Sequence, residues 1–366
     1  MFDHAELPAL AGCAYLNAGT NGPLPRAAAE AMTAEVEAAL RHPRVGTQAY
    51  ERFFAARDRA RAAVAARMGA PPEEVALTSS TTQGVGLVTA GLRFGPGDEV
   101  VTTTEEHPGV LGPLDELRVR YGVTIRAVPA DDVAAAIGPA TRMVALSHVL
   151  WTTGRVVPLE EIAAAARAAG AVTLADGAQS AGQLDLNVGA TGVDFYAISG
   201  QKWLLGPNGS GALWVHPDQR DRLRPATPSY LTYTDGEVGT LRAGCDRFDA
   251  GTIDPATLAG LAAAVEWVAG LPGGWPAWLA LARERTAAAH ERLAVAGIPV
   301  AGHAGEGTGL IAFEAPGRDP TEVVEALAAR SVLVRTIPGT AYLRMSVGAW
   351  TSDADLDALV EGLAAG

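Results

Sequence analysis

The stretch Asp194-Phe-Tyr-Ala-Ile-Ser-Gly-Gln-Lys-Trp-Leu-Leu-Gly-Pro-Asn-Gly-Ser-Gly211 contains Lys202, the one lysine in a chain of 366 residues. The other 27 of the 28 basic residues (28 − 1 = 27) are arginines, so a simple positive charge is supplied by arginine elsewhere. Lysine differs because its amine can lose a proton and attack a carbonyl. Apolar neighbours would lower the pKa of that amine. The stretch therefore predicts a nucleophilic lysine just after a strand at 193–198. A chain-wide bias against lysine, which leaves one ordinary surface lysine, is the alternative.

The composition is typical of a globular protein, since 48 % of the residues are hydrophobic. This length suits one large and one smaller lobe. The net charge of −13 argues against nucleic acid or an anionic membrane as a partner. The Arg-rich segment 52–67 has helical spacing and predicts one face of an amphipathic helix rather than a basic patch.

The sequence shows no sign of export, disulfides or metal binding. Its first residues lack a signal-peptide pattern, and no run approaches about 18 apolar residues, so we expect a cytoplasmic protein. Cys13 and Cys245 are too few for a disulfide framework. The seven histidines form no metal-binding motif, and we expect no metal.

Apolar runs of strand length alternate with segments of helical periodicity through most of the chain. This alternation predicts an α/β fold with a mostly parallel sheet covered by helices. A smaller α+β unit follows it. We place a large domain at 15–254 and a small domain at 1–14 plus 255–366. The strands expected in the large domain lie at 75–78, 99–104, 124–128, 143–148, 171–176, 193–198 and 211–215.

A hydroxyl-rich loop, Thr78-Ser-Ser-Thr-Thr-Gln-Gly84, lies between an expected strand and a helix that begins near Gln83. Backbone N–H groups at a helix N-terminus, with hydroxyls beside them, form a site for an anion such as phosphate. Thr81 and Thr82 are therefore candidate phosphate ligands. Simple capping of the helix by Ser80 or Thr81 is the alternative.

Two further candidates follow the ends of expected strands. The apolar run 171–176 ends in Asp176, and a buried carboxylate requires a cationic partner. The protonated ring nitrogen of a cofactor would serve, and so would an arginine. His107 follows the strand at 99–104, at the edge where parallel α/β proteins display functional side chains. An isolated loop histidine is otherwise an ordinary surface residue.

These candidates together match the needs of pyridoxal 5′-phosphate (PLP). Its aldehyde requires a lysine, its ring nitrogen an acid, and its phosphate a set of hydroxyl and N–H donors. Lys202, Asp176 and the Thr81/Thr82 loop provide them in turn. The ring of His107 could stack on the pyridine.

Four segments resemble the class V, fold-type I PLP-dependent enzymes, the group of cysteine desulfurases, selenocysteine lyases and kynureninases. The resemblance covers nearly the whole chain. Within the group, Leu146-Ser-His-Val-Leu-Trp-Thr-Thr-Gly154 is most similar to the cysteine/cystine C–S lyases. The four segments are Glu106-His107, Asp176-Gly-Ala-Gln179, Ser199-Gly-Gln-Lys202-Trp-Leu-x-Gly-Pro-x-Gly and Arg247-Phe-x-x-Gly-Thr252.

The resemblance implies a role for each matching residue around the cofactor ring. Lys202 would bond the cofactor aldehyde and move the Cα proton. Asp176 would pair with the pyridinium nitrogen, and Gln179 would hydrogen-bond the ring hydroxyl. His107 would stack on the ring face.

The resemblance also implies a phosphate site that is completed by a second subunit. Thr82 and Ser199 would bind the phosphate. Gln201 stands where the group usually has histidine, and its amide can still donate a hydrogen bond to the cofactor. Thr252 would reach the cofactor phosphate of the neighbouring subunit, since such enzymes are homodimers whose active sites are shared across the interface.

On the substrate side, Arg344 matches the position that binds the α-carboxylate, a task suited to a bidentate guanidinium. Asn17 and Trp151 are further candidate substrate contacts, and Trp151 stands where desulfurases have asparagine. Desulfurases carry a nucleophilic cysteine near 332–341, and this chain has none there. Nothing around Cys245 suggests an activated thiolate.

We therefore expect a PLP-dependent carbon–sulfur lyase, which cleaves cysteine or cystine by β-elimination to pyruvate, ammonia and a sulfur product. A class V aminotransferase or an amino-acid epimerase would use the same cofactor and the same lysine. A persulfide-forming desulfurase lacks its cysteine here. A dinucleotide-dependent oxidoreductase would need a glycine fingerprint, but after Gly84 and Gly86 the third glycine falls at Gly91. A binding protein without catalysis would not bond a cofactor through Lys202.

Overall fold

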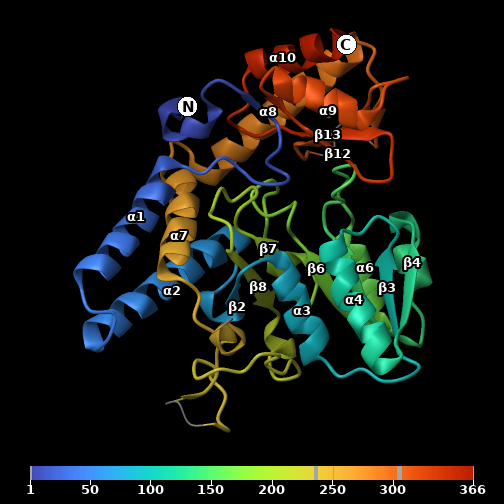
Figure 1. Ribbon diagram of the computed structural model, residues 1–366. Coiled ribbons are helices and arrows are strands. Elements are labelled where there is room, and N and C mark those ends of the chain that lie inside the picture. The colour runs from blue at the N-terminus through green and yellow to red at the C-terminus, as the bar shows by residue number, and fades with distance from the viewer. Residues whose placement is uncertain (1, 235–237, 250, 303–306, 366) are drawn as a thin grey trace.

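A seven-stranded sheet forms the centre of the computed structural model, which describes residues 2–234, 238–249, 251–302 and 307–365. The strand order is β2-β8-β7-β6-β5-β3-β4, and the sheet lies in the lower half of Figure 1. The strands are β2 (Val75–Thr78), β3 (Glu99–Thr103), β4 (Thr124–Val128), β5 (Thr141–Ser147), β6 (Val172–Asp176), β7 (Phe195–Ser199) and β8 (Gly211–Val215).

Six of these strands run in one direction, because only β8 pairs antiparallel with its neighbours β2 and β7. The carboxyl ends of the six parallel strands therefore lie along one edge of the sheet. The last residues of five of them are polar. These are Thr78, Thr103, Ser147, Asp176 and Ser199.

Alternating residues of each strand pack against helices on opposite faces, as a period of two requires. Val100 and Phe195 face one layer, while Val101 and Tyr196 face the other. Because both faces are covered, the central residues of the inner strands are buried and mostly apolar, whereas the edge strand β4 is largely exposed. The first layer contains α3 (Thr81–Gly91) and α4 (Pro108–Tyr121); the second contains α2 (Thr47–Met68), α5 (Val133–Ala136) and α6 (Leu159–Ala168).

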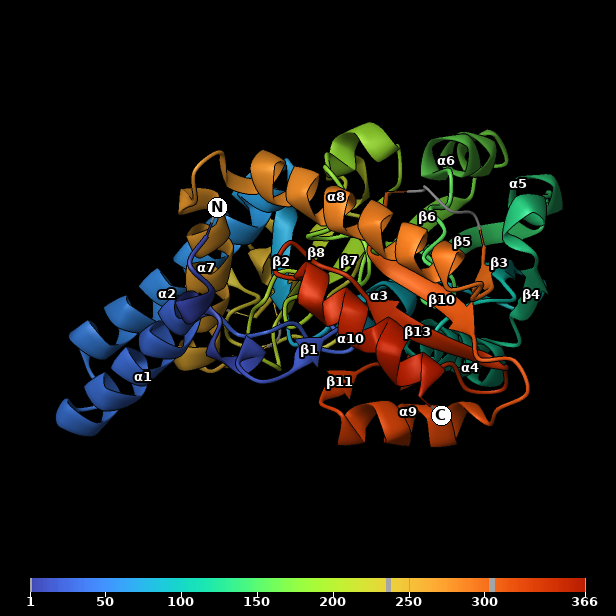
Figure 2. The same ribbon diagram turned by 90° about the horizontal axis from the view of Figure 1, so that it is seen from above.

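A second, antiparallel sheet has the strand order β12-β13-β10-β9. Together with three helices it lies above the carboxyl edge of the large sheet (Figures 1 and 2). The fold class expected from the sequence is confirmed. The elements are β9 (Val300–Ala301), β10 (Leu310–Glu314), β12 (Arg335–Thr336), β13 (Tyr342–Ser346), α8 (Gly274–Val295), α9 (Pro320–Ala329) and α10 (Asp353–Ala364).

Each of the two predicted domains has segments that pack against the other. Strand β1 (Ala14–Tyr15) pairs with β11 (Val332–Leu333) beside the small sheet. Helix α7 (Pro255–Gly270) packs against α1 (Arg26–Arg41) and α2. The limits at 15–254 and 255–366 stay a proposal. Within the described residues no single helix is long and apolar enough to cross a membrane; α7 and α8 pass that test only as a pair bent by 81°.

Candidate active site

Residues from the carboxyl edge of the large sheet meet residues of the small sheet in a cavity of about 220 Å³. The N-terminal loop closes it from one side. We call it the Lys202 cavity. Its lining consists of Gly19, Thr20, Ser80, Thr81, Thr82, His107, Ser147, Trp151, Asp176, Ala178, Gln179, Ser199, Gln201, Lys202, Arg335 and Arg344.

Lys202 lies in the turn at 200–210 that links β7 to β8. The turn is closed by backbone bonds in which Gly200 N–H donates to Ser210 O and Gly206 N–H donates to Gly200 O. Burial lowers the pKa of the Lys202 amine to about 8; the carboxylate of Asp176 opposes this shift, and two arginines add to it. The amine is therefore neutral, and hence nucleophilic, at mildly alkaline pH.

The N-terminal loop packs directly on this turn. Gly22 N–H donates to Gln201 O (2.8 Å), and a Cβ at Gly22 would overlap the Lys202 carbonyl oxygen. Gly19 lies close to Arg344 in the same way. Glycine is required at both positions because the loop passes between the lysine turn and the small sheet.

Asp176 ends β6 and is fully enclosed. Burial raises the pKa of its carboxyl, and the charge of Lys202 together with the Ala178 N–H counteract that rise. The Ala178 N–H donates to Oδ1 (2.7 Å). The carboxylate thus has one fixed donor and faces a cavity that contains a cation.

Glu106 is a buried carboxyl to which the sequence analysis assigned no role. Its Oε1 accepts from Thr103 Oγ1 (2.8 Å) and from the Ser147 N–H (2.9 Å), and its Oε2 accepts from Ser147 Oγ (2.6 Å). Burial raises the pKa of Glu106 to about 7. Glu106 therefore joins the end of β3 to the end of β5. Its position directly before His107 was the available signal.

His107 caps the start of α4, where its Nδ1 accepts from the Gly109 N–H (3.0 Å). Its ring meets Trp151 edge to face, with centroids 5.2 Å apart. Burial lowers the pKa of His107 to about 4, and the nearby charges of Lys202 and the arginines add to that shift. The imidazole is therefore neutral and presents a flat ring to the cavity.

The start of α3 lies in the wall of the Lys202 cavity, and its role as an anion site stays a prediction. Ser80 is the N-cap, and its Oγ accepts from the Gln83 N–H (3.1 Å). Thr81 Oγ1 is buried and has no hydrogen-bond partner in the described part of the chain. Ser199 Oγ donates to Gln201 Oε1 (2.7 Å), so the Gln201 amide presents its N–H₂ end as a donor.

Gln179 connects two segments that border the cavity. Its Nε2 donates to Gly19 O (2.9 Å), and its Oε1 accepts from Trp203 Nε1 (2.8 Å). One Nε2 hydrogen remains beyond these bonds. The predicted hydrogen bond from Gln179 to a ring hydroxyl stays a prediction.

Two guanidinium groups enter from the small sheet. Arg335 and Arg344 are paired residues on β12 and β13. Arg344 Nη1 donates to Trp151 O (2.7 Å), while Arg344 Nε and Nη2 are buried without a partner among the described residues. Burial lowers the pKa of Arg344 to about 9, with Arg335 as a second cause. The sequence analysis missed Arg335, although it would lie opposite Arg344 in a hairpin.

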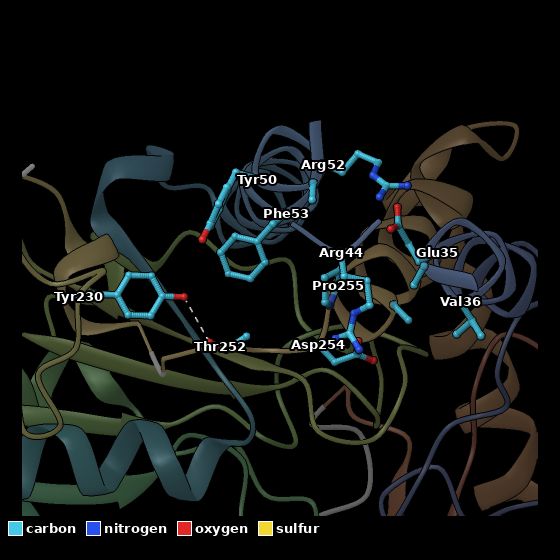
Figure 3. A pocket seen from close by; sticks show the side chains of 13 residues that line it. Glu35, Val36, Arg44, Tyr50, Arg52, Phe53, Tyr230, Thr252, Asp254 and Pro255 are labelled. Atoms are coloured by element: carbon cyan, nitrogen blue, oxygen red, sulfur yellow. Dashed lines mark hydrogen bonds between the residues drawn. The ribbon is translucent and has the colours of Figure 1, made fainter. Parts of the chain in front are cut away.

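Two predicted site residues lie outside the cavity lining. Asn17 is linked to the cavity through Thr20. Its Oδ1 accepts from Thr20 Oγ1 (2.9 Å), and Thr20 Oγ1 accepts from Arg335 Nη1 (3.3 Å). Thr252 lies in a separate groove of about 380 Å³ beside Tyr230, 3.3 Å from its hydroxyl (Figure 3). The contact of Thr252 with a second subunit stays a prediction.

The cavity fits PLP and a carboxylate-bearing substrate. Buried polar atoms without partners are rare in folded proteins, and four of them belong to residues that line this cavity: Thr81 Oγ1, Trp151 Nε1, and Nε and Nη2 of Arg344. They need acceptors such as phosphate and carboxylate oxygens. Within the described residues, no group of three or more His, Cys, Asp or Glu is arranged to hold a metal.

A family model described as aminotransferase class-V matches residues 14–359. The chain belongs to this family. Class V enzymes depend on PLP, and PLP is the cofactor of this protein. The resemblance expected from the sequence motifs is thereby confirmed at the level of the family and the cofactor.

Relatives of this class V enzyme have more than one activity. Isopenicillin N epimerase of Streptomyces clavuligerus is 31 % identical over 95 % of the chain and 93 % of that protein. A probable cysteine desulfurase of Methanothermobacter thermautotrophicus is 33 % identical over 72 % of the chain and 68 % of that protein.

Solved structures of C-DES are similar to the whole fold. A C-DES mutant with glycine covalently linked to the PLP cofactor is 29 % identical and matches with a TM-score of 0.95, over 100 % of this chain and 99 % of that one. The cystine C–S lyase C-DES with its product cysteine persulfide matches with a TM-score of 0.93 and 29 % identity, over 98 % and 99 % of the two chains.

Proposed function

We propose that this class V enzyme cleaves the carbon–sulfur bond of cystine or cysteine by β-elimination, giving pyruvate, ammonia and a sulfur product. The observation that carries the proposal is the pair of guanidinium groups, Arg335 and Arg344, at the substrate end of the Lys202 cavity.

The charge balance of the cavity favours a substrate with two carboxylates. Asp176 is the one carboxylate among the described lining residues, and it lies at the end where the cofactor ring nitrogen is expected. Arg344 has Nε and Nη2 without partners, and Arg335 has one contact to Thr20 and one to a backbone carbonyl. Two close cations are repelled unless anions lie between them. Cystine has two α-carboxylates and so could satisfy both arginines.

The fate of sulfur in the proposal follows from the cysteines. Residues 332–341 contain no cysteine, and burial raises the pKa of Cys245 to about 12. Neither position provides a thiolate that could accept sulfur. The sulfur product would therefore leave as a small molecule. The match to C-DES, which is named a cystine C–S lyase, supports the same proposal.

Each residue has a part in this chemistry. PLP, when bound, supplies an electron sink for the substrate Cα. Lys202, neutral above about pH 8, would accept the Cα proton at Nζ. Asp176 would hold a negative charge at the ring nitrogen, and neutral His107 would pack on the ring face without adding a positive charge. Thr81, Thr82, Ser199 and Gln201 would hold the phosphate.

Epimerisation is the second candidate, because the 31 % identity to isopenicillin N epimerase extends over 95 % of the chain. An epimerase returns the proton to the opposite face of Cα, whereas a lyase expels the β-substituent first. Transamination by the same residues would instead require an acceptor keto acid.

One assay separates these reactions. The PLP-loaded enzyme is incubated with cystine, with cysteine, and with alanine plus a keto acid. We expect stoichiometric pyruvate and ammonia from cystine without an acceptor. A new keto acid that forms only with an acceptor would make the enzyme an aminotransferase. Change of optical rotation without ammonia would make it an epimerase.

A homodimer that shares its active sites is part of the proposal. The groove around Thr252 is lined by α1 and α2 together with Tyr230, and it contains Val36, Tyr50 and Phe53 (Figure 3). Val36 is 62 % exposed, Tyr50 59 % and Tyr230 57 %. Apolar patches of this kind mark association surfaces. If a second copy binds in this groove, Thr252 of the first copy would lie near the cofactor site of the second copy, as the family resemblance implies.

Hydrogen bonds from α2 and β2 hold Asp249, which lies just before Thr252 in the sequence. Arg57 and Arg61 on α2 both donate to the buried carboxylate of Asp249, and Asp249 Oδ1 also accepts from the Leu77 N–H (2.7 Å). A fully paired buried carboxylate fixes the backbone around it. This fixed position suits a residue that must meet a partner subunit. The cytoplasmic location is retained as a prediction.

A further inference from the structure

Three buried side chains form a hydrogen-bonded chain behind the Asp176 strand end. His148 Nδ1 lies 2.6 Å from Tyr196 Oη, and Tyr196 Oη lies 2.5 Å from Ser180 Oγ. Ser180 Oγ donates in turn to Gly177 O (3.2 Å). We call these three residues the His148 chain. None of them lines the Lys202 cavity.

The outer end of the chain reaches a second cavity. His148 lines a space of about 550 Å³ beside α6 and the 184–191 segment. Its lining residues differ from those of the Lys202 cavity. Tyr196 lines neither cavity and is fully buried in the core layer formed with α2 and α6.

The inner end of the chain holds the turn that carries Asp176. Ser180 contacts Gly177 O, and the Tyr196 ring packs so closely on Gly177 that a Cβ there would overlap it. The His148 N–H donates to Asp176 O (2.9 Å). Ala178, which follows Gly177, supplies the N–H that donates to the Asp176 carboxylate. The three residues therefore contact the carbonyl group of Asp176 and the glycine that follows it.

The chain has two hydrogen-bond arrangements, and only the first includes the bond from Ser180 to Gly177 O. In the first, His148 Nδ1–H donates to Tyr196, Tyr196 donates to Ser180, and Ser180 donates to Gly177 O. In the second, Ser180 donates to Tyr196, Tyr196 donates to a bare His148 Nδ1, and the imidazole proton sits on Nε2. Two hydroxyls rotate, and the imidazole exchanges its proton with water, so no proton is gained or lost. A doubly protonated His148 permits the first arrangement alone.

We propose that His148, Tyr196 and Ser180 are positioning residues for Asp176, and that the protonation and tautomer of His148 at the second cavity set how firmly the Asp176 turn is held. The proposal rests on PLP dependence and not on the identity of the substrate.

The charged groups around the chain are few. On the inner side Asp176 faces Lys202 and lies near Glu106. On the outer side Glu160, Glu161 and Asp185 line the second cavity with His148. Arg67 of α2 lies near Tyr196 and is held by Leu184 O. Burial lowers the pKa of His148 to about 4, so the two neutral tautomers are the forms that exchange near neutral pH.

Tyr196→Phe tests the chain, because it removes one hydroxyl and keeps the ring that packs on Gly177. The Asp176 charge raises the pKa of the free Lys202 amine, and we expect an effect of the same sign on this nitrogen when PLP is bound. A loosened turn holds that charge less well, so the pH midpoint of the visible absorbance of the PLP-loaded protein should fall by about one unit. PLP affinity, measured by fluorescence quenching, should fall as well.

Thr102→Val is the matched control. Thr102 is fully buried in the same sheet, and its Oγ1 donates to Ala145 O (2.7 Å) without touching the turn. Both variants lose one buried hydroxyl and should lose similar thermal stability, but only Tyr196→Phe should move the absorbance midpoint. Equal midpoints in both variants and the parent would overturn the proposal.

A second pair keeps the proposal testable if Tyr196→Phe does not fold. The amide of His148→Asn sits where Nδ1 was and can still bond Tyr196, whereas His148→Leu cannot. The Asn variant should keep a midpoint near the parental value, and the Leu variant should show the lowered one. Identical midpoints in the Asn and Leu variants would show that the chain only fills space.

Discussion

Charge is distributed unevenly around Lys202. One buried carboxylate, Asp176, opposes the amine and the two guanidinium groups of Arg335 and Arg344. Burial lowers the pKa of the amine from its ordinary 10.5 to about 8, because the attraction of Asp176 offsets only part of the effect of burial. The same shortage of negative charge makes the cavity receptive to phosphate and carboxylates.

The lowered pKa of Lys202 predicts how the apoprotein takes up PLP. Only the neutral amine attacks the aldehyde. The rate of uptake should therefore rise as pH increases through about 8 and level off above it, well below the ordinary 10.5. Stopped-flow absorbance between pH 6.5 and 10 measures this rate. Lys202→Ala should bind PLP without the covalent absorbance band. A rise centred near pH 10 would contradict the assignment.

Substitution of Arg335 and substitution of Arg344 should have different effects on the KM values of cysteine and cystine. Arg344→Met should raise KM for cysteine and cystine alike, because both have one α-carboxylate next to Cα. Arg335→Met should raise KM for cystine by about tenfold, equivalent to about 1.4 kcal/mol, and change that for cysteine little. The cofactor absorbance serves as the control for intact PLP binding. Equal effects of Arg335→Met on both substrates would exclude a role in binding the second carboxylate.

At the scale of single elements, the start of α3 combines two different hydroxyls. Ser80 is satisfied within the protein, where it caps the helix. Thr81 is buried without a partner in the described part of the chain. The first stabilises the helix, and the second is maintained at a loss of stability that a bound phosphate would reverse.

Substitution of these hydroxyls should act in opposite directions on the apoprotein. Thr81→Val removes an unsatisfied polar atom and should stabilise apoprotein by up to about 1 kcal/mol, while it lowers PLP affinity. Ser80→Ala removes a cap and should destabilise the apoprotein by about 1 kcal/mol. Thermal denaturation with and without PLP measures both effects. A Thr81→Val variant that is less stable without PLP would show that Thr81 is a structural cap.

The elements themselves were largely predictable. Strands such as 75–78 and 211–215 agree with the structure, because strands buried on both faces are apolar along their length. Residues such as Arg335 and Tyr196 were not selected, since their importance arises from neighbours distant in sequence. Arg335 becomes a candidate site residue only because it pairs with Arg344 across β12 and β13. Tyr196 resembles any core aromatic until His148 and Ser180 are placed beside its hydroxyl.

At the scale of the whole molecule, the exposed face of α1 and α2 distinguishes one side of the protein. These helices project beyond the seven-stranded sheet in Figures 1 and 2. The groove that they form with Thr252 and Tyr230 is the surface that we assign to the homodimer.

Charge placed in that groove should dissociate the dimer. Val36→Glu introduces a carboxylate on an apolar surface of α1, and we expect monomers together with weaker PLP binding, since Thr252 of the second copy would be lost from the site. Val119→Glu is the matched control, because Val119 is 63 % exposed on α4, away from the groove. Analytical ultracentrifugation reports the mass of each. A dimeric Val36→Glu protein would place the interface elsewhere.

The enclosed position of the one lysine has a practical consequence for covalent labelling. Lys202 is the one lysine side chain of this chain, and it lines the Lys202 cavity. Borohydride treatment of the PLP-loaded protein should therefore give a single adduct in an intact mass spectrum. Acylating reagents too large for the cavity should leave Lys202 unmodified, so the extent of Lys202 labelling records which molecules enter the active site.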